Sequence, residues 1–344
     1  MKKKAIVAMS GGLDSSVTAL ILKQQGYEVI GVTGKMLDTP CSQIVCDNAK
    51  AVADKLDIEH YVIDATKIFK EKVVDYFENS YSSGKTPNPC IQCNKFVKWG
   101  EVFDYSMEKF GADIFATGHY ADVRNVDGIY KLYPAKDTKK DQLYFLYRLS
   151  QNVLARTIFP LYEYDKNEVR NLAEKYDLPS KSAKESQDIC FIKHPMTTKK
   201  YLNNILENKK GDFIEKSSGK ILGHHDGYWQ YTIGQRKGIG IAAPEPLYVI
   251  EIDPQTNTVF VGYKEDLYKN KLILSNIQWS YPIDKKEFEA LVKIRYNMNP
   301  IKAFIKIDKE IEIIFNDKIS AIAPGQACVV YDIENGSLLG GSFI

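Results

Sequence analysis

The segment VAMSGGLDSSV, residues 7–17, constrains the fold of this chain more than any other stretch. The apolar run KKKAIVAMS, typical of a buried strand, ends at its Ser-Gly-Gly turn, and the helical pattern SSVTALILKQQG follows the turn. A turn that leads from a strand into a helix presents backbone N–H groups to an anion. The segment therefore predicts a phosphate site at the end of a buried strand.

The residues of this loop indicate which nucleotide chemistry to expect. The loop has no lysine to hold a γ-phosphate, so it is not the common nucleotide-binding loop. Its form, Ser-Gly-Gly-x-Asp-Ser-Ser, is similar to the pyrophosphate loop of ATP pyrophosphatases, which transfer AMP to a substrate oxygen and release pyrophosphate. Asp14 is unfavourable beside phosphate unless it binds Mg²⁺ or organises the turn. We therefore predict an adenylation site, with an ordinary strand-to-helix turn as the alternative.

Strand and helix patterns alternate along the first part of the chain. Strands are expected at YEVIGVTG, EHYVIDAT and ADIFATGHYADV, and helices at DNAKAVADKLDI, over about residues 67–82 and at KFVKWGEVFDYSMEKFG. This alternation predicts an α/β fold with a doubly wound, Rossmann-like parallel sheet. Its ligand site is expected at the carboxyl ends of the strands, at residues 10–16, 31–36 and 117–119.

The texture of the sequence changes after about residue 200. Glycine and turn pairs become frequent, as in GDFIEKSSGKILGHHDGYWQ, and short alternating strands such as ALVKIRYN, IKAFIKID and IEIIFND follow. These patterns predict two small β-rich domains. The expected division is a catalytic domain at 1–200, a central β-rich domain at 201–270 and a C-terminal β-barrel at 271–344.

Charge and hydropathy bound the class of protein. The net charge of +2 over 344 residues gives no global argument for nucleic-acid binding, which local basic clusters would have to supply. The N-terminal apolar stretch, Ala5 to Met9, is shorter than the core of a signal peptide, and no apolar run is long enough to span a bilayer. We therefore expect a cytoplasmic protein that does not enter a membrane.

Six cysteines narrow the chemistry. A cytoplasmic chain of this length rarely carries a disulfide framework, so metal, redox and nucleophilic roles are open. In TPNPCIQCNKFVKWG, residues 86–100, a CxxC pair stands where a proline-rich loop leads into a helix. A thiol at a helix N-terminus has a lowered pKa, so Cys93 is a candidate thiolate. Zinc, a redox pair and chance remain alternatives for this pair, and ESQDICFIKH adds Cys190.

Eight stretches, spread almost end to end, carry a more specific resemblance. They are AMSGGLDSSV, TPNPCIQCNKFVKWG, ATGHYADV, KDQLYFLYRL, ESQDICFI, GYWQYTIGQRKGIGI, KIRYN and APGQACVVYD. With them the chain resembles the tRNA-specific 2-thiouridylases, a family of the pyrophosphate-loop ATP pyrophosphatases that thiolates the wobble uridine of certain tRNAs. The resemblance implies a monomeric sulfurtransferase whose central domain binds tRNA. Its implied partners are the anticodon loop of tRNA and a persulfide sulfur donor protein.

The resemblance also implies roles for individual residues. Cys93 is the implied nucleophile, Cys190 the implied persulfide carrier, and Asp14 is implied to take part in catalysis. The residues implied to bind ATP, which brings Mg²⁺, are Ala8, Met9, Ser10, Gly11, Gly12, Leu13, Asp14, Ser15, Gly34 and Gly118. The residues implied to contact the target base or the tRNA are Asn88, Pro89, Cys90, His119, Lys140, Asp141, Gln142, Arg295, Tyr296 and Gln326.

The chain departs from the family pattern at three places. Cys90 stands where the family usually has Asp, residues 186–188 read Ser-Gln-Asp instead of Ser-Thr-Gly, and Gly34 replaces a residue, commonly Met, that covers the adenine. The extra thiol opens an alternative cofactor, since Cys90, Cys93 and Cys190 could hold a [4Fe–4S] cluster with an open fourth position. The preferred expectation is a persulfide relay.

The chemistry of such a relay follows from the reactivity of its parts. Adenylation turns the C2 oxygen of uridine into a leaving group, and a persulfide on Cys190 delivers sulfur to C2. Cys93 then reduces the remaining S–S bond, which leaves a Cys93–Cys190 disulfide for cellular thiols to reset. The base must be splayed out of the anticodon loop. Both cysteines are expected on mobile loops that close over it.

Two other functions stay open at this stage. One is an amide-forming ligase with a pyrophosphate loop, which would leave Cys93 and Cys190 without a role. The other is a non-catalytic RNA-binding protein built on a decayed loop, against which the intact residues 10–16 argue.

Several cysteines and histidines have ordinary structural explanations. Cys41 and Cys46 are expected in a loop or at a helix start, and Cys328 is expected in a core strand. The adjacent His224 and His225 could suggest a metal, but a histidine pair in a loop is expected to be solvated.

Overall fold

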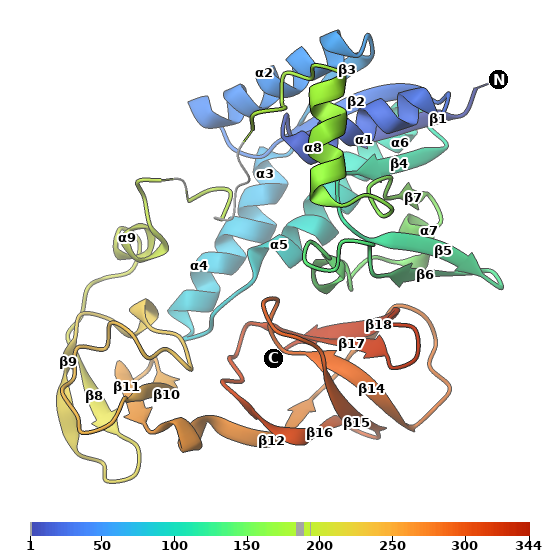
Figure 1. The fold of residues 1–344 in the computed structure, drawn as a ribbon. Helices are drawn as coiled ribbons and strands as arrows, with labels where there is room; N and C mark the ends of the chain where they lie inside the picture. The colour runs from blue at the N-terminus through green and yellow to red at the C-terminus, as the bar shows by residue number, and fades with distance from the viewer. Residues whose placement is uncertain (1, 184–188, 193) are drawn as a thin grey trace.

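The N-terminal part of the chain is built around one parallel sheet. A computed structural model describes residues 2–183, 189–192 and 194–344. Its five-stranded sheet has the order β3-β2-β1-β4-β7, and every neighbouring pair is parallel (Figure 1). The strands are β1 (Lys4–Ala8), β2 (Glu28–Lys35), β3 (Glu59–Asp64), β4 (Ile114–Thr117) and β7 (Thr157–Ile158). This sheet confirms the predicted doubly wound α/β fold.

Strand β1 lies in the middle of the sheet because its side chains are apolar on both faces. Ile6 packs into a buried cluster with Phe115 and Trp99, whereas Val7 packs into another cluster with Leu20. Both β1 side chains are fully buried, and burial of a side chain of this size contributes roughly 1.5–3 kcal/mol. A parallel strand buried on both faces reads as a continuous apolar run, which is why the sequence identifies β1.

Helices surround this sheet and continue beyond it (Figure 1). They are α1 (Leu13–Gln24), α2 (Pro40–Lys55), α3 (Thr66–Phe69), α4 (Asp75–Ser82), α5 (Pro89–Gln92), α6 (Phe103–Phe110), α7 (Gln151–Leu154), α8 (Lys166–Lys175) and α9 (Thr198–Asn203). The π-helical segments η1 (Lys70–Val74) and η2 (Cys93–Val102) join α3 to α4 and α5 to α6. Short 3₁₀ turns are η3 (Leu143–Phe145), η4 (Tyr228–Gln230) and η5 (Lys264–Leu267). Within the described residues, none of the helices has the length and apolarity needed to cross a membrane.

Two predicted elements differ from the structure. Helix α2 begins at Pro40, earlier than DNAKAVADKLDI predicts, because the side chain of Thr39 caps it and proline suits its first turn. The stretch ADIFATGHYADV is not one strand. β4 ends at Thr117, and β5 (Asp122–Val126) pairs with β6 (Ile129–Tyr133) in a separate hairpin. The chain turns between them at Gly118, where it packs against α1.

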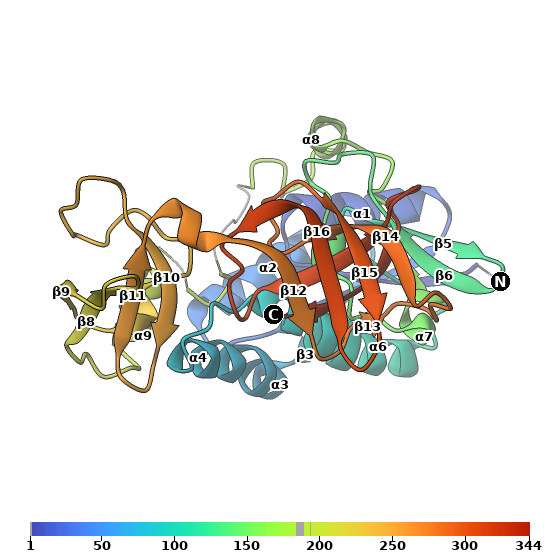
Figure 2. The ribbon, with the colours of Figure 1, turned by 90° about the horizontal axis from the view of Figure 1, so that it is seen from below.

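Two further sheets form the second part of the chain and confirm that it is β-rich. One has the order β10-β11-β8-β9, with strands Tyr248–Asp253, Thr258–Gly262, Gly211–Glu215 and Ile221–His225. The other has the order β12-β16-β15-β14-β17-β18-β13, with strands Tyr268–Leu274, Ile311–Ser320, Ile301–Ile307, Glu287–Lys293, Ala327–Asp332, Leu338–Phe343 and Gln278–Trp279. The smaller sheet lies to one side of the larger one (Figure 2).

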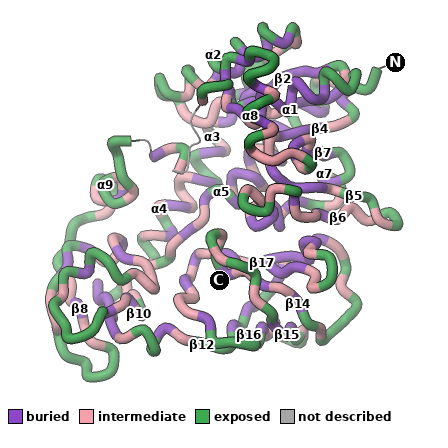
Figure 3. The backbone as a smooth tube through the Cα atoms, viewed as in Figure 1, coloured by how far each residue is buried: buried purple, intermediate pink, exposed green. Residues whose placement is uncertain are grey.

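The larger β sheet packs directly on the N-terminal part of the chain. Strand β17 is almost entirely buried (Figure 3), and its residues Ala327, Val329 and Tyr331 share one buried cluster with Tyr144. The hydroxyl of Tyr144 donates to the carbonyl of Ala327 at 2.9 Å and accepts from its N–H at 3.1 Å. The same buried cluster contains Ile91 and Cys93, so the C-terminal sheet packs beside the segment that carries the CxxC pair.

Candidate active site

The phosphate loop turns tightly between the end of β1 and the start of α1. Gly11 has a φ of +68°, and a Cβ there would lie 2.6 Å from the side chain of Asn48 in α2, so the turn requires glycine. The hydroxyls of Ser15 and Ser16 both donate to the carbonyl of Gly12, at 3.2 and 2.7 Å. The N–H groups of Ser10 and Gly12 also donate within the loop, to the hydroxyl of Ser15 at 3.2 Å and to that of Ser10 at 3.4 Å. These contacts brace the turn at the N-terminus of α1, where an anion is favoured.

The other predicted ATP-binding residues lie around this loop. The side chains of Met9 and Leu13 are buried in the core, so only their backbones can face a nucleotide. A Cβ on Gly34, near the end of β2, would lie 2.9 Å from Cγ2 of Val102. The side chain of Val102 thus crowds the place where the family commonly has methionine.

A cavity of about 210 Å³ opens beside Gly11. Asn48 of α2 and residues of the segment 179–183 line it. Ser180 in this lining is only 4% exposed, and within the described residues its hydroxyl has no hydrogen-bond partner. A buried hydroxyl without a partner is unfavourable, so this lining is a candidate anion site beside the phosphate loop.

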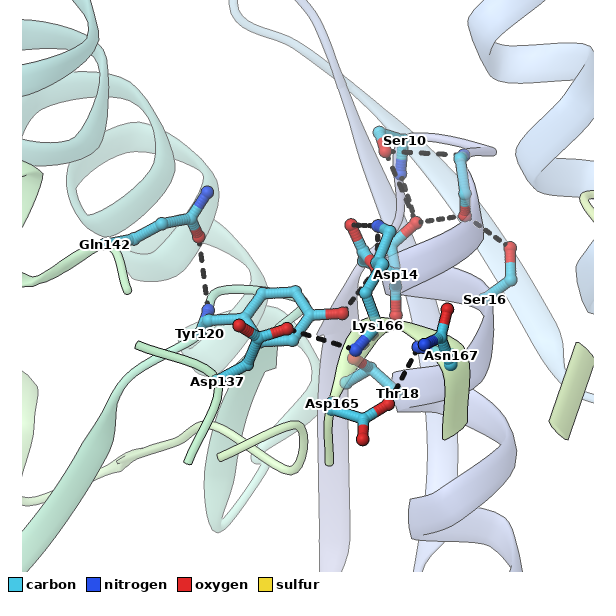
Figure 4. Close-up of polar contacts among 12 residues, drawn as sticks. Ser10, Asp14, Ser16, Thr18, Tyr120, Asp137, Gln142, Asp165, Lys166 and Asn167 are labelled. Atoms are coloured by element: carbon cyan, nitrogen blue, oxygen red, sulfur yellow. Dashed lines mark hydrogen bonds and ion pairs between the residues drawn. The ribbon is translucent and has the colours of Figure 1, made fainter. Parts of the chain in front are cut away.

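Asp14, in the first turn of α1, is the only charged residue of the loop 8–16. Its two carboxylate oxygens lie 2.7 and 2.8 Å from Nζ of Lys166, and the hydroxyl of Tyr120 donates to it at 3.1 Å (Figure 4). The lysine side chain is 11% exposed and the aspartate side chain 33%. The structure therefore supplies a lysine to this loop from α8, far away in the sequence.

The sequence reasoning missed Lys166, although one signal was present. Lys166 is the first residue of α8, directly after Asp165, whose side chain caps the helix in a capping box with Glu168. A cation is disfavoured at a helix N-terminus because the helix dipole is positive there. A lysine directly after a recognisable capping residue therefore indicates a partner elsewhere in the fold.

A chain of contacts leads from the phosphate loop to Lys98, whose charge acts on Cys93. Gly118 packs so closely on α1 that a Cβ there would lie 2.8 Å from the backbone of Asp14. The ring of His119 contacts the hydroxyl of Thr117 at 2.7 Å through Nδ1 and Nζ of Lys98 at 3.5 Å through Nε2. Burial is the main cause that holds the pKa of His119 well below its usual range, and the charge of the nearby Lys98 lowers this pKa further. The ring is therefore neutral.

Cys93 is placed differently from the prediction. Helix α5 begins at Pro89 with Asn88 as its N-cap, so Cys90 lies in the first turn and Cys93 one turn further on. Cys93 opens η2 and is only 6% exposed. The expectation that it lies on a mobile loop is therefore wrong. π-helical turns often mark functional sites.

The prediction of a lowered pKa for Cys93 is also wrong. Burial raises the pKa of its thiol to about 12, and this exceeds the lowering effect of Lys98. The helix dipole acts mainly within the first turn, whereas desolvation of a thiolate acts wherever the sulfur is enclosed. Burial likewise raises the pKa of Cys90, and Lys98 again opposes it, although that residue keeps an exposed surface.

The structure brings the three candidate thiols into one neighbourhood. Cys90 and Cys190 both act electrostatically on Cys93, and Cys190 is exposed in a turn. Throughout the described ranges, however, no three acidic, histidine or cysteine side chains are arranged to hold a metal ion. The departure at 186–188 lies outside the described residues. The thiols of Cys90 and Cys190 therefore lie close enough to Cys93 to influence its ionisation.

Several predicted tRNA positions are engaged inside the protein. Asp141 accepts from the N–H groups of Leu143 and Ala135, and burial raises its pKa to about 6. Gln142 accepts from the N–H of Tyr120 at 3.1 Å through Oε1. The ring of Tyr296 lies 4.5 Å from that of Phe145. Lys140 is half-buried and Arg295 exposed.

Gln326 joins the C-terminal sheet to the segment that precedes the CxxC pair. Its Nε2 donates to the carbonyl of Thr86 at 2.8 Å, and the N–H of Thr86 donates to the carbonyl of Pro324, also at 2.8 Å. The hydroxyl of Thr86 contacts that of Thr232, in the smaller β domain, at 3.2 Å. Thr86 is thus a junction of three parts of the chain, two residues before the N-cap of α5.

The remaining candidates are explained by packing, with two corrections. Cys46 is not in a loop or at a helix start: it lies inside α2 and is 4% exposed. Cys41 lies at the start of α2, and Cys328 is fully buried in β17, as predicted. His225 is not solvated: it lies in strand β9, is 4% exposed and packs on Phe213. His224 is exposed and contacts Asp212 at 2.7 Å.

The raised pKa of Cys93 predicts an unusual pH dependence of its alkylation. A thiol reacts as its thiolate, so the rate should rise about tenfold per pH unit up to the pKa. An ordinary cysteine levels off above about pH 8.5, whereas Cys93 should keep rising through pH 10. Peptide mass spectrometry after timed iodoacetamide treatment of the free protein measures this rate. A rate for Cys93 that levels off below pH 9 would contradict the burial of its sulfur.

Comparisons with known proteins agree on one family. Three family models cover most of the chain: a tRNA methyl transferase HUP domain at residues 3–194, a tRNA methyl transferase PRC-barrel domain at 199–263 and an aminomethyltransferase beta-barrel domain at 269–344. A tRNA-specific 2-thiouridylase of Carboxydothermus hydrogenoformans is 43% identical, and the match covers 100% of this chain and 98% of the relative.

Two further relatives have the same name. That of Clostridium botulinum is 43% identical over 98% of this chain and 97% of its own length. That of Trichormus variabilis is 42% identical over 99% of this chain and 98% of its own length. The similarity spans the phosphate loop, the CxxC segment and both β sheets, and the chain belongs to the family of tRNA-specific 2-thiouridylases.

Proposed function

We propose that this chain catalyses the ATP-dependent 2-thiolation of the wobble uridine in tRNA. The observation that carries the proposal is the chain of contacts that leads from the phosphate loop through Gly118 and His119 to Lys98, whose charge acts on Cys93. A uridine bound along it would have its leaving group at the loop and its incoming sulfur near Cys93. The relatives that match over nearly their whole length are named tRNA-specific 2-thiouridylases.

ATP is the proposed co-substrate, with its phosphates at the loop 8–15 and its adenosine near Gly34 and Gly118. Ser180, whose hydroxyl has no hydrogen-bond partner among the described residues, lines the cavity beside Gly11 and supports a phosphate there. Both oxygens of Asp14 are engaged by Lys166, so Asp14 as placed does not fit a Mg²⁺ ligand. We therefore propose that Mg²⁺ enters with the phosphates of ATP.

Sulfur is proposed to travel through two cysteines. The outer sulfur of a Cys190 persulfide attacks C2 of the adenylated uridine, and AMP leaves with the former C2 oxygen. Cys93, after losing its proton, attacks the Cys190 sulfur, which forms a Cys93–Cys190 disulfide and releases 2-thiouridine. A cellular dithiol then reduces that disulfide. Lys98 is the cation that favours the Cys93 thiolate against the effect of burial.

The anticodon loop of tRNA and a persulfide-carrying donor protein are the proposed partners of a monomeric enzyme. We propose that the three domains divide at about residues 200 and 270. Exposed Arg295 and half-buried Lys140 have side chains suited to phosphate contacts. The positions proposed to meet the target base or the tRNA are Asn88, Pro89, Cys90, His119, Lys140, Asp141, Gln142, Arg295, Tyr296 and Gln326.

A [4Fe–4S] cluster on Cys90, Cys93 and Cys190 is the second candidate mechanism for the same reaction. The closeness of three thiols favours it. The described side chains do not form a ligand set for a metal, however, and Cys93 is enclosed by the protein. The relay needs only Cys93 and Cys190, so it is the mechanism proposed here.

One experiment tests the function and both mechanisms. The protein is purified without oxygen, with iron and sulfide reconstitution, and incubated with tRNA, ATP and a persulfide donor. We expect wobble 2-thiouridine by mass spectrometry, stoichiometric AMP and pyrophosphate, and a colourless protein whose Cys90→Ala variant stays active. Release of ADP and phosphate would contradict adenylation. Broad visible absorbance, lost in Cys90→Ala together with activity, would replace the relay by the cluster.

A further inference from the structure

The phosphate loop carries a negative charge that no other residue of the loop neutralises. Its one charged side chain, Asp14, is an acid in the first turn of α1. The N-terminus of a helix favours an anion, so Asp14 competes with the phosphates of ATP for the same positive end. Two negative charges that lie close together repel strongly when water is partly excluded from between them. A bare Asp14 would therefore weaken ATP binding.

Lys166 has the geometry to cancel this charge. Its Nζ lies 2.7 and 2.8 Å from the two oxygens of Asp14, and its side chain is 11% exposed (Figure 4). The ammonium group contacts both oxygens over which the single negative charge of Asp14 is spread, so the pair is neutral. Tyr120 donates to the same carboxylate at 3.1 Å. The loop together with Lys166 then carries a formal charge of zero.

The position of Lys166 is held by contacts that do not involve Asp14. The N–H of Lys166 donates to Asp137 at 3.2 Å, and the side chain of Asp165 caps α8 in a reciprocal pair with Glu168. These carboxylates offset the cost of a cation at the first position of a helix. The backbone of Lys166 is thus fixed beside the phosphate loop, and its side chain needs only to extend to reach Asp14.

We propose that Lys166 is a positioning residue for ATP: it neutralises Asp14 and does not itself contact the phosphates. The inference rests on the proposed use of ATP and deepens it, because the pyrophosphate loop lacks a lysine of its own. It also assigns Asp14 to the Lys166 pair and not to Mg²⁺. The charge of the loop with residue 166 then determines ATP affinity. That charge is zero in the native chain, −1 in Lys166→Met, +1 in Asp14→Asn and zero in the double variant.

The test is equilibrium binding of Mg-ATP to the full chain, measured by calorimetry without tRNA. We expect Lys166→Met to bind ATP about 10- to 100-fold more weakly, the range that follows from leaving one partner of a partly buried charge pair unpaired. Asp14→Asn should bind at least as tightly as the native chain. The double variant should return to within about threefold of the native affinity, since two compensating changes restore the charge. Lys166→Arg should retain most of the affinity.

Controls separate this role from a purely structural one. Lys175→Met removes an exposed lysine from the last turn of the same helix and should leave ATP affinity unchanged. Thermal unfolding of every variant reports folding independently. If the double variant binds as weakly as Lys166→Met, Lys166 contacts phosphate directly and the proposal is wrong. It is equally wrong if folded Lys166→Met binds ATP normally, or if the native chain binds no ATP. A native chain that binds ATP but does not thiolate tRNA would overturn only the proposed function.

Discussion

Replacement of either Cys93 or Cys190 by serine is expected to abolish 2-thiolation of tRNA. Each residue supplies one sulfur of the relay, and a serine hydroxyl can neither carry a persulfide nor reduce one. Cys328→Ser is the matched control, because Cys328 is also a buried thiol but lies in the core of the C-terminal sheet. It should retain thiolation. The measurement is wobble 2-thiouridine per tRNA by mass spectrometry.

The two serine variants should also differ in what they accumulate. Cys93→Ser can still form the persulfide on Cys190 and displace AMP, so it should release AMP once and then stop with the tRNA linked to Cys190. Cys190→Ser should form no such link. Full single-turnover activity of Cys190→Ser with sulfide as donor would remove the persulfide role, while the role of Cys93 could stand.

The parts of the fold that follow from local pattern were predictable from the sequence. The run that forms β1 is apolar on both faces, and the turn at Gly11 tolerates only glycine. Both properties depend on a few neighbouring residues, so the phosphate loop can be located without the rest of the molecule. The prediction of a single strand at ADIFATGHYADV failed for the opposite reason. The chain turns at Gly118 because it packs there against α1, a long-range contact that the local pattern does not show.

The electrostatics of the site could not be predicted in the same way. The pKa of Cys93 depends on how completely the packed protein encloses its sulfur, and no spacing in the sequence reports that. Lys166 forms an ion pair with Asp14, which lies near the other end of the N-terminal part of the chain. The junction at Thr86 likewise joins three segments that are distant in the chain. Each is a long-range contact, which requires the fold before it can be recognised.

Asp14→Asn is expected to lower the turnover of thiolation by on the order of 100-fold while ATP affinity is kept. Without the carboxylate, Lys166 and Tyr120 lose their common partner, and a shift of about 1 Å in a reacting group can cost this much. The freed Lys166 could also pair with the phosphates of bound ATP. Binding gained in the ground state does not accelerate the reaction. ATP labelled at its γ-phosphate reports pyrophosphate release, and mass spectrometry of the tRNA from the same sample reports thiolation.

The separation of turnover from affinity is what makes this variant informative. A general loss of helix stability would lower both quantities, and Asp104→Asn controls for it by removing an exposed acid from the first turn of α6. If Asp14 were a Mg²⁺ ligand, Asp14→Asn would weaken ATP binding and raise the Mg²⁺ concentration needed for half-maximal activity. The Lys166 pair predicts neither change, because the neutral asparagine only removes a charge that repels phosphate. Normal turnover in Asp14→Asn would show that the carboxylate is dispensable, and the first turn of α1 would then bind phosphate through its backbone alone.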